Sequence, residues 1–151
     1  MKYVNGDIRE AKESVIAHGC NTQGVMGSGV ALAIKRKWPD VYAVYCDHLK
    51  NGGGWLGDCS VCQVEMDRYV VNLYTQKFYG TETRHVNYAA ILTSLDDMFG
   101  KLYLISNTDI KSVAIPKIGA GLGGGDWNII KALLLDYEKL RDVEFVVYCI
   151  E

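Results

Sequence analysis

The sequence predicts an α/β protein: a three-layer α/β/α sandwich around a mixed, mostly parallel six-stranded sheet. Short β-branched runs alternate with amphipathic runs, which is typical of parallel strands joined by crossover helices. Two glycine-rich loops each follow a strand and precede a helix. A chain of 151 residues with 49% apolar content and two prolines has the size of one compact domain. We therefore expect a single domain over residues 1–151.

The expected strands are short and rich in β-branched residues. They cover Lys2 to Ile8, Ser14 to Gly19, Ser60 to Met66, Arg68 to Thr75, Lys111 to Ile115 and Val143 to Ile150. The expected helices carry apolar residues at helical spacing. They cover Gly29 to Trp38, Val41 to Leu49, Asn87 to Leu104 and Trp127 to Leu140. Pro39 separates the first helix from the second, because proline interrupts a helix interior.

Charge and cysteine content narrow the class of protein. Lysine and arginine total 16 against 18 for aspartate and glutamate, so the net charge of -2 gives no general reason to bind nucleic acid. No apolar run reaches the ~18 to 20 residues that cross a bilayer, so we expect no membrane partner. Five cysteines, an odd number, and no signal peptide after Met1 indicate a reducing compartment. We expect a cytoplasmic monomer.

Cys59 and Cys62 have the spacing of half a zinc site or of a redox pair. No second such pair and no paired histidines accompany them, so the sequence favours ordinary buried thiols. We expect no metal and no cofactor.

The two glycine loops carry the main functional signal. The first, Gly24 to Gly29, is neither a Rossmann fingerprint nor a P-loop, and the second runs from Lys117 to Gly125. Glycine lets a ligand approach backbone N–H groups closely, and a helix that follows adds unpaired donors and a positive dipole end. Parallel strands place such loops at one sheet edge. Two of them together predict a metal-independent phosphate or pyrophosphate site.

Several side chains near these loops are candidates for chemistry. His18 ends the second strand and could act as a general base, a general acid or a phosphoryl acceptor. The alternative is a core histidine bonded to backbone. Asn21 could contact a ligand hydroxyl or shape the loop. Asp7 could accept from an adenine amine or cap a turn, and Asp126 is most simply a helix N-cap.

The ordered motifs resemble those of a macrodomain. They are Gly6-Asp7-Ile8, Ala17-His18-Gly19-Cys20-Asn21, Gly24-Val25-Met26-Gly27-Ser28-Gly29-Val30-Ala31 and Ile115-Pro116-Lys117-Ile118-Gly119-Ala120-Gly121-Leu122. The sequence is similar to the branch that holds the ADP-ribose-1″-phosphate phosphatase of yeast and the terminal ADP-ribose glycohydrolases. The resemblance spans the whole chain and implies ADP-ribose as the ligand.

The resemblance also implies where the ligand lies. Adenine would contact Asp7 and Ile8, and the distal ribose would lie near His18, Asn21 and Thr75, with Gln76 beside it. The diphosphate would lie between the two loops, whose implied contact residues are Gly24, Met26, Gly27, Ser28, Gly29, Val30, Ile118, Gly119, Ala120, Gly121, Leu122 and Gly123.

The members of this branch catalyse different reactions and differ in their catalytic residues. The glycohydrolases carry a lysine directly after the threonine of the strand and an aspartate in the second loop, where this sequence has Gln76 and Gly123. Lys77 and Asp126 are neighbours, but one residue along a strand turns a side chain to the other face. The phosphatase has a histidine at the position of His18. The resemblance thus favours hydrolysis of ADP-ribose-1″-phosphate, a phosphoric monoester, with a non-catalytic ADP-ribose reader or removal of ADP-ribose from protein or nucleic acid as alternatives.

Overall fold

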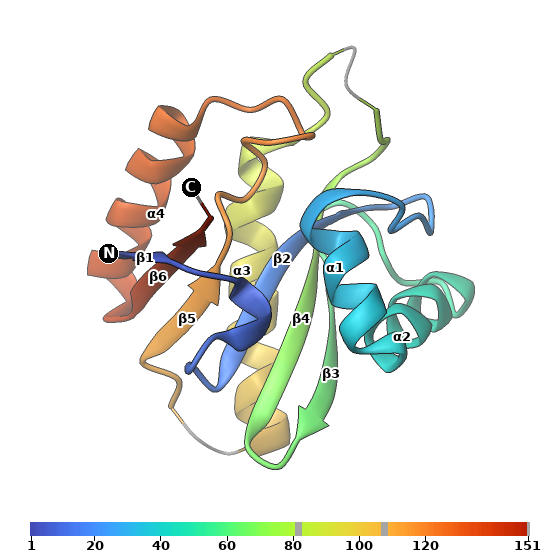
Figure 1. Ribbon diagram of the computed structural model, residues 1–151, viewed down its shortest axis with the longest axis horizontal. Helices are drawn as coiled ribbons and strands as arrows, with labels where there is room; N and C mark the ends of the chain where they lie inside the picture. The colour runs from blue at the N-terminus through green and yellow to red at the C-terminus, as the bar shows by residue number, and fades with distance from the viewer. Residues whose placement is uncertain (81–82, 107–108, 151) are drawn as a thin grey trace.

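The computed structural model describes residues 1–80, 83–106 and 109–150. Its sheet has the strand order β1-β6-β5-β2-β4-β3, and every neighbouring pair is parallel except β3 with β4 (Figure 1). The strands are β1 (Lys2–Asn5), β2 (Val15–Asn21), β3 (Cys59–Glu65), β4 (Arg68–Gln76), β5 (Ser112–Ile115) and β6 (Glu144–Cys149). This arrangement confirms the predicted mixed, mostly parallel six-stranded sheet.

Helices cover both faces of the sheet, as the strand and helix alternation predicts (Figure 1). They are the short 3-10 helix η1 (Ile8–Glu10) and the helices α1 (Gly29–Lys37), α2 (Pro39–Lys50), α3 (Tyr88–Ser106) and α4 (Trp127–Arg141). On β2, Val15 and Ala17 pack with α3 and α4, whereas Ile16 packs with α1 and α2. Successive side chains of a buried strand therefore serve two separate cores.

Most element boundaries differ from the sequence prediction by one to three residues, and three of these differences bear on the site or have a clear local cause. The first strand ends at Asn5, because the Asp7 side chain accepts from the Arg9 amide and caps η1. Strand β2 continues to Asn21 rather than ending at Gly19, which carries Cys20 and Asn21 to the sheet edge. Pro39 opens α2 as well as closing the preceding turn, since a first helical position needs no N–H donor.

Cys59 and Cys62 lie on opposite faces of β3. Cys59 packs in the α3 and α4 core and Cys62 in the α1 and α2 core, and both thiols are free and buried. Both thiols are therefore buried on separate sides of the sheet and form no disulfide with each other. None of the helices in the described ranges combines the length and apolar character needed to cross a membrane.

Candidate functional site

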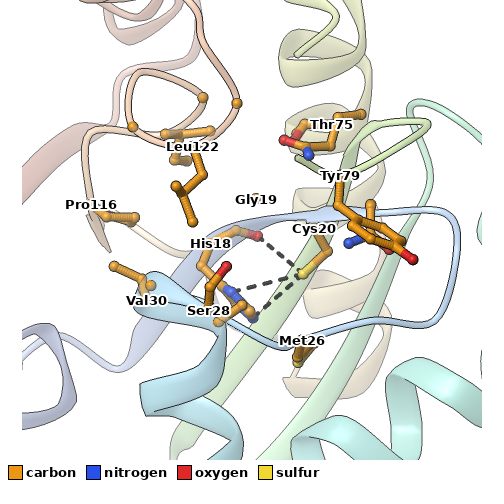
Figure 2. A pocket seen from close by; sticks show the side chains of 18 of the residues that line it. His18, Gly19, Cys20, Met26, Ser28, Val30, Thr75, Tyr79, Pro116 and Leu122 are labelled. Carbon is orange, nitrogen blue, oxygen red and sulfur yellow. Dashed lines mark hydrogen bonds between the residues drawn. The ribbon is translucent and has the colours of Figure 1, made fainter. Parts of the chain in front are cut away.

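A cavity of about 530 Å3 lies at the carboxyl ends of β2, β4 and β5. This volume is within the range of small-molecule sites. Both predicted glycine loops line the cavity, and Tyr79, which follows β4, lines it as well (Figure 2). The position agrees with the rule that ligands of open α/β sheets bind beyond the carboxyl ends of the strands.

The first loop is held in place by Asn21 and by a buried tyrosine of α2. The hydroxyl of Tyr45 lies 2.7 Å from Oδ1 of Asn21 and accepts from the amides of Gly24 and Val25 at 3.0 and 3.2 Å. The Asn21 amide group donates to the Val25 carbonyl at 2.8 Å. Asn21 therefore shapes the loop in this structure, and the Gly24 amide is already used by Tyr45.

The amides beyond this anchor remain available. Within the described part of the chain, no oxygen accepts from the amides of Met26, Gly27 or Ser28. Helix α1 begins directly afterwards, at Gly29, and adds the unpaired N–H groups of its first turn. The φ of Gly29 is +59°, a left-handed conformation that glycine adopts without strain. This segment is a cluster of free backbone donors that faces the cavity.

The second loop lies against the first. A Cβ added at Gly29 would lie 3.4 Å from Cδ1 of Leu122, so the two loops meet at one wall of the cavity. No oxygen in the described ranges accepts from the amides of Gly121, Leu122 or Gly123. The sequence prediction that both glycine loops adjoin one site is therefore confirmed in its geometry.

His18 lines the cavity but is almost completely buried, with 1% exposure. Its Nε2 lies 2.7 Å from Oδ1 of Asn72, and the Cys20 sulfur lies 3.7 to 3.8 Å from the two ring nitrogens (Figure 2). Burial lowers the pKa of His18 to about 4, although the bond to Asn72 opposes this effect. The imidazole is therefore neutral at pH 7. Burial also raises the pKa of the Cys20 thiol, which stays protonated.

Thr75 carries an orphaned hydroxyl at the end of β4. Its Oγ1 is buried without a hydrogen-bond partner among the described residues, and the residue lines the cavity. A Cβ added at Gly19 would lie 2.8 Å from this oxygen, so any larger residue at position 19 would clash with the Thr75 hydroxyl. Buried hydroxyls almost always have partners. That this hydroxyl contacts a ligand stays a prediction.

Comparison with known proteins agrees with this geometry. The family model described as Macro domain matches residues 17–134. The chain belongs to the macro domain family. A DNA ADP-ribosyl glycohydrolase of Mycobacterium tuberculosis is 31% identical over 152 residues, which are 98% of this chain and 42% of that protein. This macro domain thus spans less than half of the length of that glycohydrolase.

Two further relatives match along nearly their whole length. An ADP-ribose 1″-phosphate phosphatase of Lodderomyces elongisporus is 28% identical over 161 residues, covering 100% of this macro domain and 99% of that protein. The solved macrodomain of Mycobacterium tuberculosis DarG has a TM-score of 0.82 and 29% identity, covering 99% of this chain and 97% of that one. The resemblance found in the sequence is therefore confirmed at the level of family and fold.

The macro domain brings most of the predicted site residues to the cavity. Those that line it are His18, Asn21, Met26, Gly27, Ser28, Gly29, Val30, Thr75, Gln76, Ile118, Gly119, Gly121, Leu122 and Gly123. Four predicted residues lie outside the lining: Asp7, Ile8, Gly24 and Ala120. Ile8 is buried in the core, and the Asp7 carboxylate is paired with the Arg9 guanidinium at 2.5 Å. That every one of these residues contacts a ligand stays a prediction.

The two positions that the glycohydrolase resemblance singles out are in contact. A Cβ added at Gly123 would lie 3.0 Å from Oε1 of Gln76 and 2.9 Å from the carbonyl oxygen of Gly119. Because the second contact is with backbone, this loop excludes any side chain at position 123. Asp126 caps α4 by accepting from the Asn128 amide, and Lys77 does not line the cavity. The macro domain therefore lacks both groups at the places where the resemblance would put them.

Four residues of the site were not among the residues predicted from the sequence. Cys20 and Val25 line the cavity, while Tyr45 and Asn72 hold its wall without lining it. A usable signal existed for Asn72, since it is a lone polar residue within the apolar run of β4. Tyr45 gave no such signal, because a tyrosine on the inner face of an amphipathic helix is ordinary core.

Proposed function

We propose that the cavity binds ADP-ribose and that the protein hydrolyses ADP-ribose-1″-phosphate to ADP-ribose and phosphate. The observation that carries the proposal is the meeting of two glycine loops with free amides at one wall of the cavity. A diphosphate between these loops would accept from Met26 to Ser28 on one side and from Gly121 to Gly123 on the other. The related phosphatase, which matches end to end, supports the same substrate.

The loops supply electrostatic stabilisation without a side-chain cation. Backbone N–H groups that are already fixed cost no reorganisation when charge develops on the phosphoryl group. The first turn of α1 adds donors and the positive end of the helix dipole next to Ser28. This arrangement suits a group that carries negative charge in both the ground state and the transition state.

His18 is the group proposed to act on the phosphoryl group. Its neutral ring can accept a proton from water or accept the phosphoryl group itself, and both roles use one unprotonated nitrogen. In the second role an Nδ1–P bond forms as the P–O1″ bond breaks, and the electron pair of the broken bond goes to O1″ of ADP-ribose, which takes a proton from water. A water molecule then attacks phosphorus, the electron pair of the Nδ1–P bond returns to Nδ1, and the attacking water gives up a proton to the solvent as inorganic phosphate leaves.

The test follows phosphate release from ADP-ribose-1″-phosphate by phosphorus NMR, with and without a chelator. We expect turnover that a chelator does not change, and a loss of at least about 100-fold in His18→Ala with ADP-ribose binding retained. His85→Ala is the matched control, because His85 does not line the cavity. A His18→Ala protein that releases phosphate at the parent rate would refute the assignment.

A second candidate is removal of ADP-ribose from modified DNA, which the similarity to the Mycobacterium tuberculosis glycohydrolase favours. The positions implied for a lysine and an aspartate hold Gln76 and Gly123, and the loop excludes a side chain at position 123. Release of free ADP-ribose from a modified oligonucleotide, abolished by Lys77→Ala, would establish this activity. Tight ADP-ribose binding without turnover of either substrate would instead indicate a reader.

A further inference from the structure

One polar side chain interrupts the buried centre of β4. Asn72 lies fully buried between Val71 and Leu73, and the strand register pairs it with His18 of β2. The two side chains share the sheet face that α1 and α2 cover, since side chains alternate along a strand. Oδ1 of Asn72 lies 2.7 Å from Nε2 of His18. An uncharged amide thus meets the imidazole directly.

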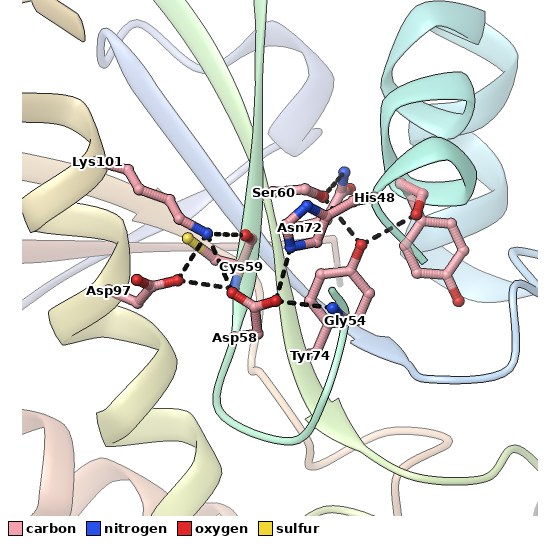
Figure 3. A network of polar contacts seen from close by, with 10 residues as sticks. His48, Gly54, Asp58, Cys59, Ser60, Asn72, Tyr74, Asp97 and Lys101 are labelled. Carbon is pink, nitrogen blue, oxygen red and sulfur yellow. Dashed lines mark hydrogen bonds and ion pairs between the residues drawn. The ribbon is translucent and has the colours of Figure 1, made fainter. Parts of the chain in front are cut away.

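Two other contacts fix the orientation of the Asn72 amide. Its Nδ2 donates to the carbonyl oxygen of Val41 at 3.3 Å. The same Nδ2 donates to Oγ of Ser60 at 3.1 Å (Figure 3). A carbonyl oxygen can only accept, so the NH2 group must face Val41. Oδ1 therefore faces His18, and because Oδ1 also can only accept, the proton in that contact belongs to Nε2.

The network continues to α2 without a missing partner. Oγ of Ser60 lies 3.1 Å from the hydroxyl of Tyr74, which donates to the Tyr45 carbonyl at 3.0 Å (Figure 3). Because the hydroxyl proton of Tyr74 is donated to that carbonyl, the Tyr74 oxygen accepts from the Ser60 hydroxyl. The Ser60 oxygen in turn accepts from Nδ2 of Asn72. A buried network with every donor satisfied holds one arrangement firmly.

We propose that Asn72 is a positioning residue that keeps His18 protonated at Nε2, so that the lone pair of Nδ1 is available for chemistry. The inference rests on the proposed function, in which that lone pair accepts a proton or a phosphoryl group. Burial favours the same neutral ring, as the lowered pKa of His18 indicates. Among the described residues, the titratable group that contacts the ring is Cys20, whose neutral thiol can donate weakly to Nδ1 at 3.8 Å.

The test is long-range proton–nitrogen NMR on the ligand-free protein, labelled with nitrogen-15 at histidine and held at pH 7. The His18 signals are assigned by their loss in His18→Ala. We expect a protonated Nε2 and an unprotonated Nδ1. A charged ring, or a proton on Nδ1, would overturn the inference. This measurement needs no turnover. If the protein releases no phosphate, the proposed function is wrong, but the spectrum still decides whether Asn72 sets the tautomer of His18.

Asn72→Asp tests the consequence for catalysis. A carboxylate against Nε2 stabilises the charged imidazolium and raises the pKa of His18. We expect Nδ1 to be protonated at pH 7, phosphate release to fall at least about 100-fold and to recover as the pH rises. ADP-ribose affinity should stay within about threefold, a change of less than about 1 kcal/mol.

Asn51→Asp is the control, because it adds the same charge at the exposed end of α2 and should change neither the spectrum nor the rate. A parent-like rate in folded Asn72→Asp would contradict the proposed role. If Asn72→Asp does not fold, the spectrum of the unmodified protein still decides the tautomer.

Discussion

Replacing Thr75 by valine should have opposite effects on stability and on ligand binding. The hydroxyl of Thr75 is buried without a partner in the described part of the structure, and it lines the cavity at the end of β4. This hydroxyl is shielded from solvent and makes no hydrogen bond to the described residues. Valine has nearly the same shape and no such penalty, so Thr75→Val should stabilise the free protein.

The expected size follows from the cost of an unsatisfied buried group, about 1 to 3 kcal/mol. A gain of about 1 kcal/mol would raise the melting temperature by roughly 2 to 4 °C in a chain of this length. In the complex, valine would leave a ligand hydroxyl unpaired instead, which should weaken ADP-ribose binding by about 5- to 150-fold. Calorimetric unfolding and isothermal titration measure the two quantities on the same preparation.

ADP and a second threonine variant provide the controls. ADP lacks the distal ribose that the resemblance places near Thr75, so its affinity should not change. Thr93 donates to the Ala89 carbonyl at 3.0 Å, and Thr93→Val should therefore lower stability slightly rather than raise it. If Thr75→Val is less stable than the parent, or binds ADP-ribose equally well, the Thr75 hydroxyl is not an unsatisfied group that the ligand pairs with.

Three further predictions concern the supports of the site and of the core. Tyr45→Phe removes the acceptor of two loop amides, and should lower both stability, by about 1 to 3 kcal/mol, and ADP-ribose affinity, by about tenfold, in the same two assays. Lys101→Met breaks the pair with the buried Asp58 and should cost about 2 kcal/mol in urea unfolding, whereas Lys111→Met at an exposed pair should leave the free energy of unfolding nearly unchanged; equal losses would contradict this reasoning. Because the folded-state pKa of His18 is lowered from 6.5 to about 4, its neutral ring favours folding above pH 6.5, and this contribution is lost as the pH falls through 4. The difference in unfolding free energy between the parent and His18→Ala should therefore shift across that window by at most about 1.4 kcal/mol per pH unit, and a constant difference would exclude a lowered pKa.

The fold was predictable because each element has a strong local pattern. The alternation of buried runs with amphipathic runs predicts the six strands and the helices α1 to α4, and the structure moves their ends by only a few residues, whereas the short helix η1 was not predicted. The errors occur where a side chain competes with the regular structure. Asp7 ends β1 early because its side chain caps η1. The spacing of apolar residues carries no information about such a side-chain contact.

Contacts between side chains of different elements were not predictable to the same degree. His48 looks like a surface residue of α2 in the sequence, yet its Nε2 lies 2.6 Å from Oδ2 of the buried Asp58 (Figure 3). Burial would raise the pKa of Asp58, but hydrogen bonds from the Gly54 amide, Lys101 and His48 lower it well below its usual range. The partners are 4 to 43 residues away along the chain, so only the folded register brings them together.

The division of the candidate site between two sheet faces constrains how a ligand can lie. His18 and Asn72 belong to the face covered by α1 and α2, whereas Thr75 stands beside Gly19 and Ile118 on the face covered by α3 and α4. Both faces adjoin one cavity at the carboxyl edge of the sheet, where β2 and β4 end. A ligand that uses both groups must cross that edge, and the free loop amides lie along the crossing. The proposed ligand, ADP-ribose-1″-phosphate, carries its diphosphate at the centre of the molecule, and the proposal places that charge beside these amides.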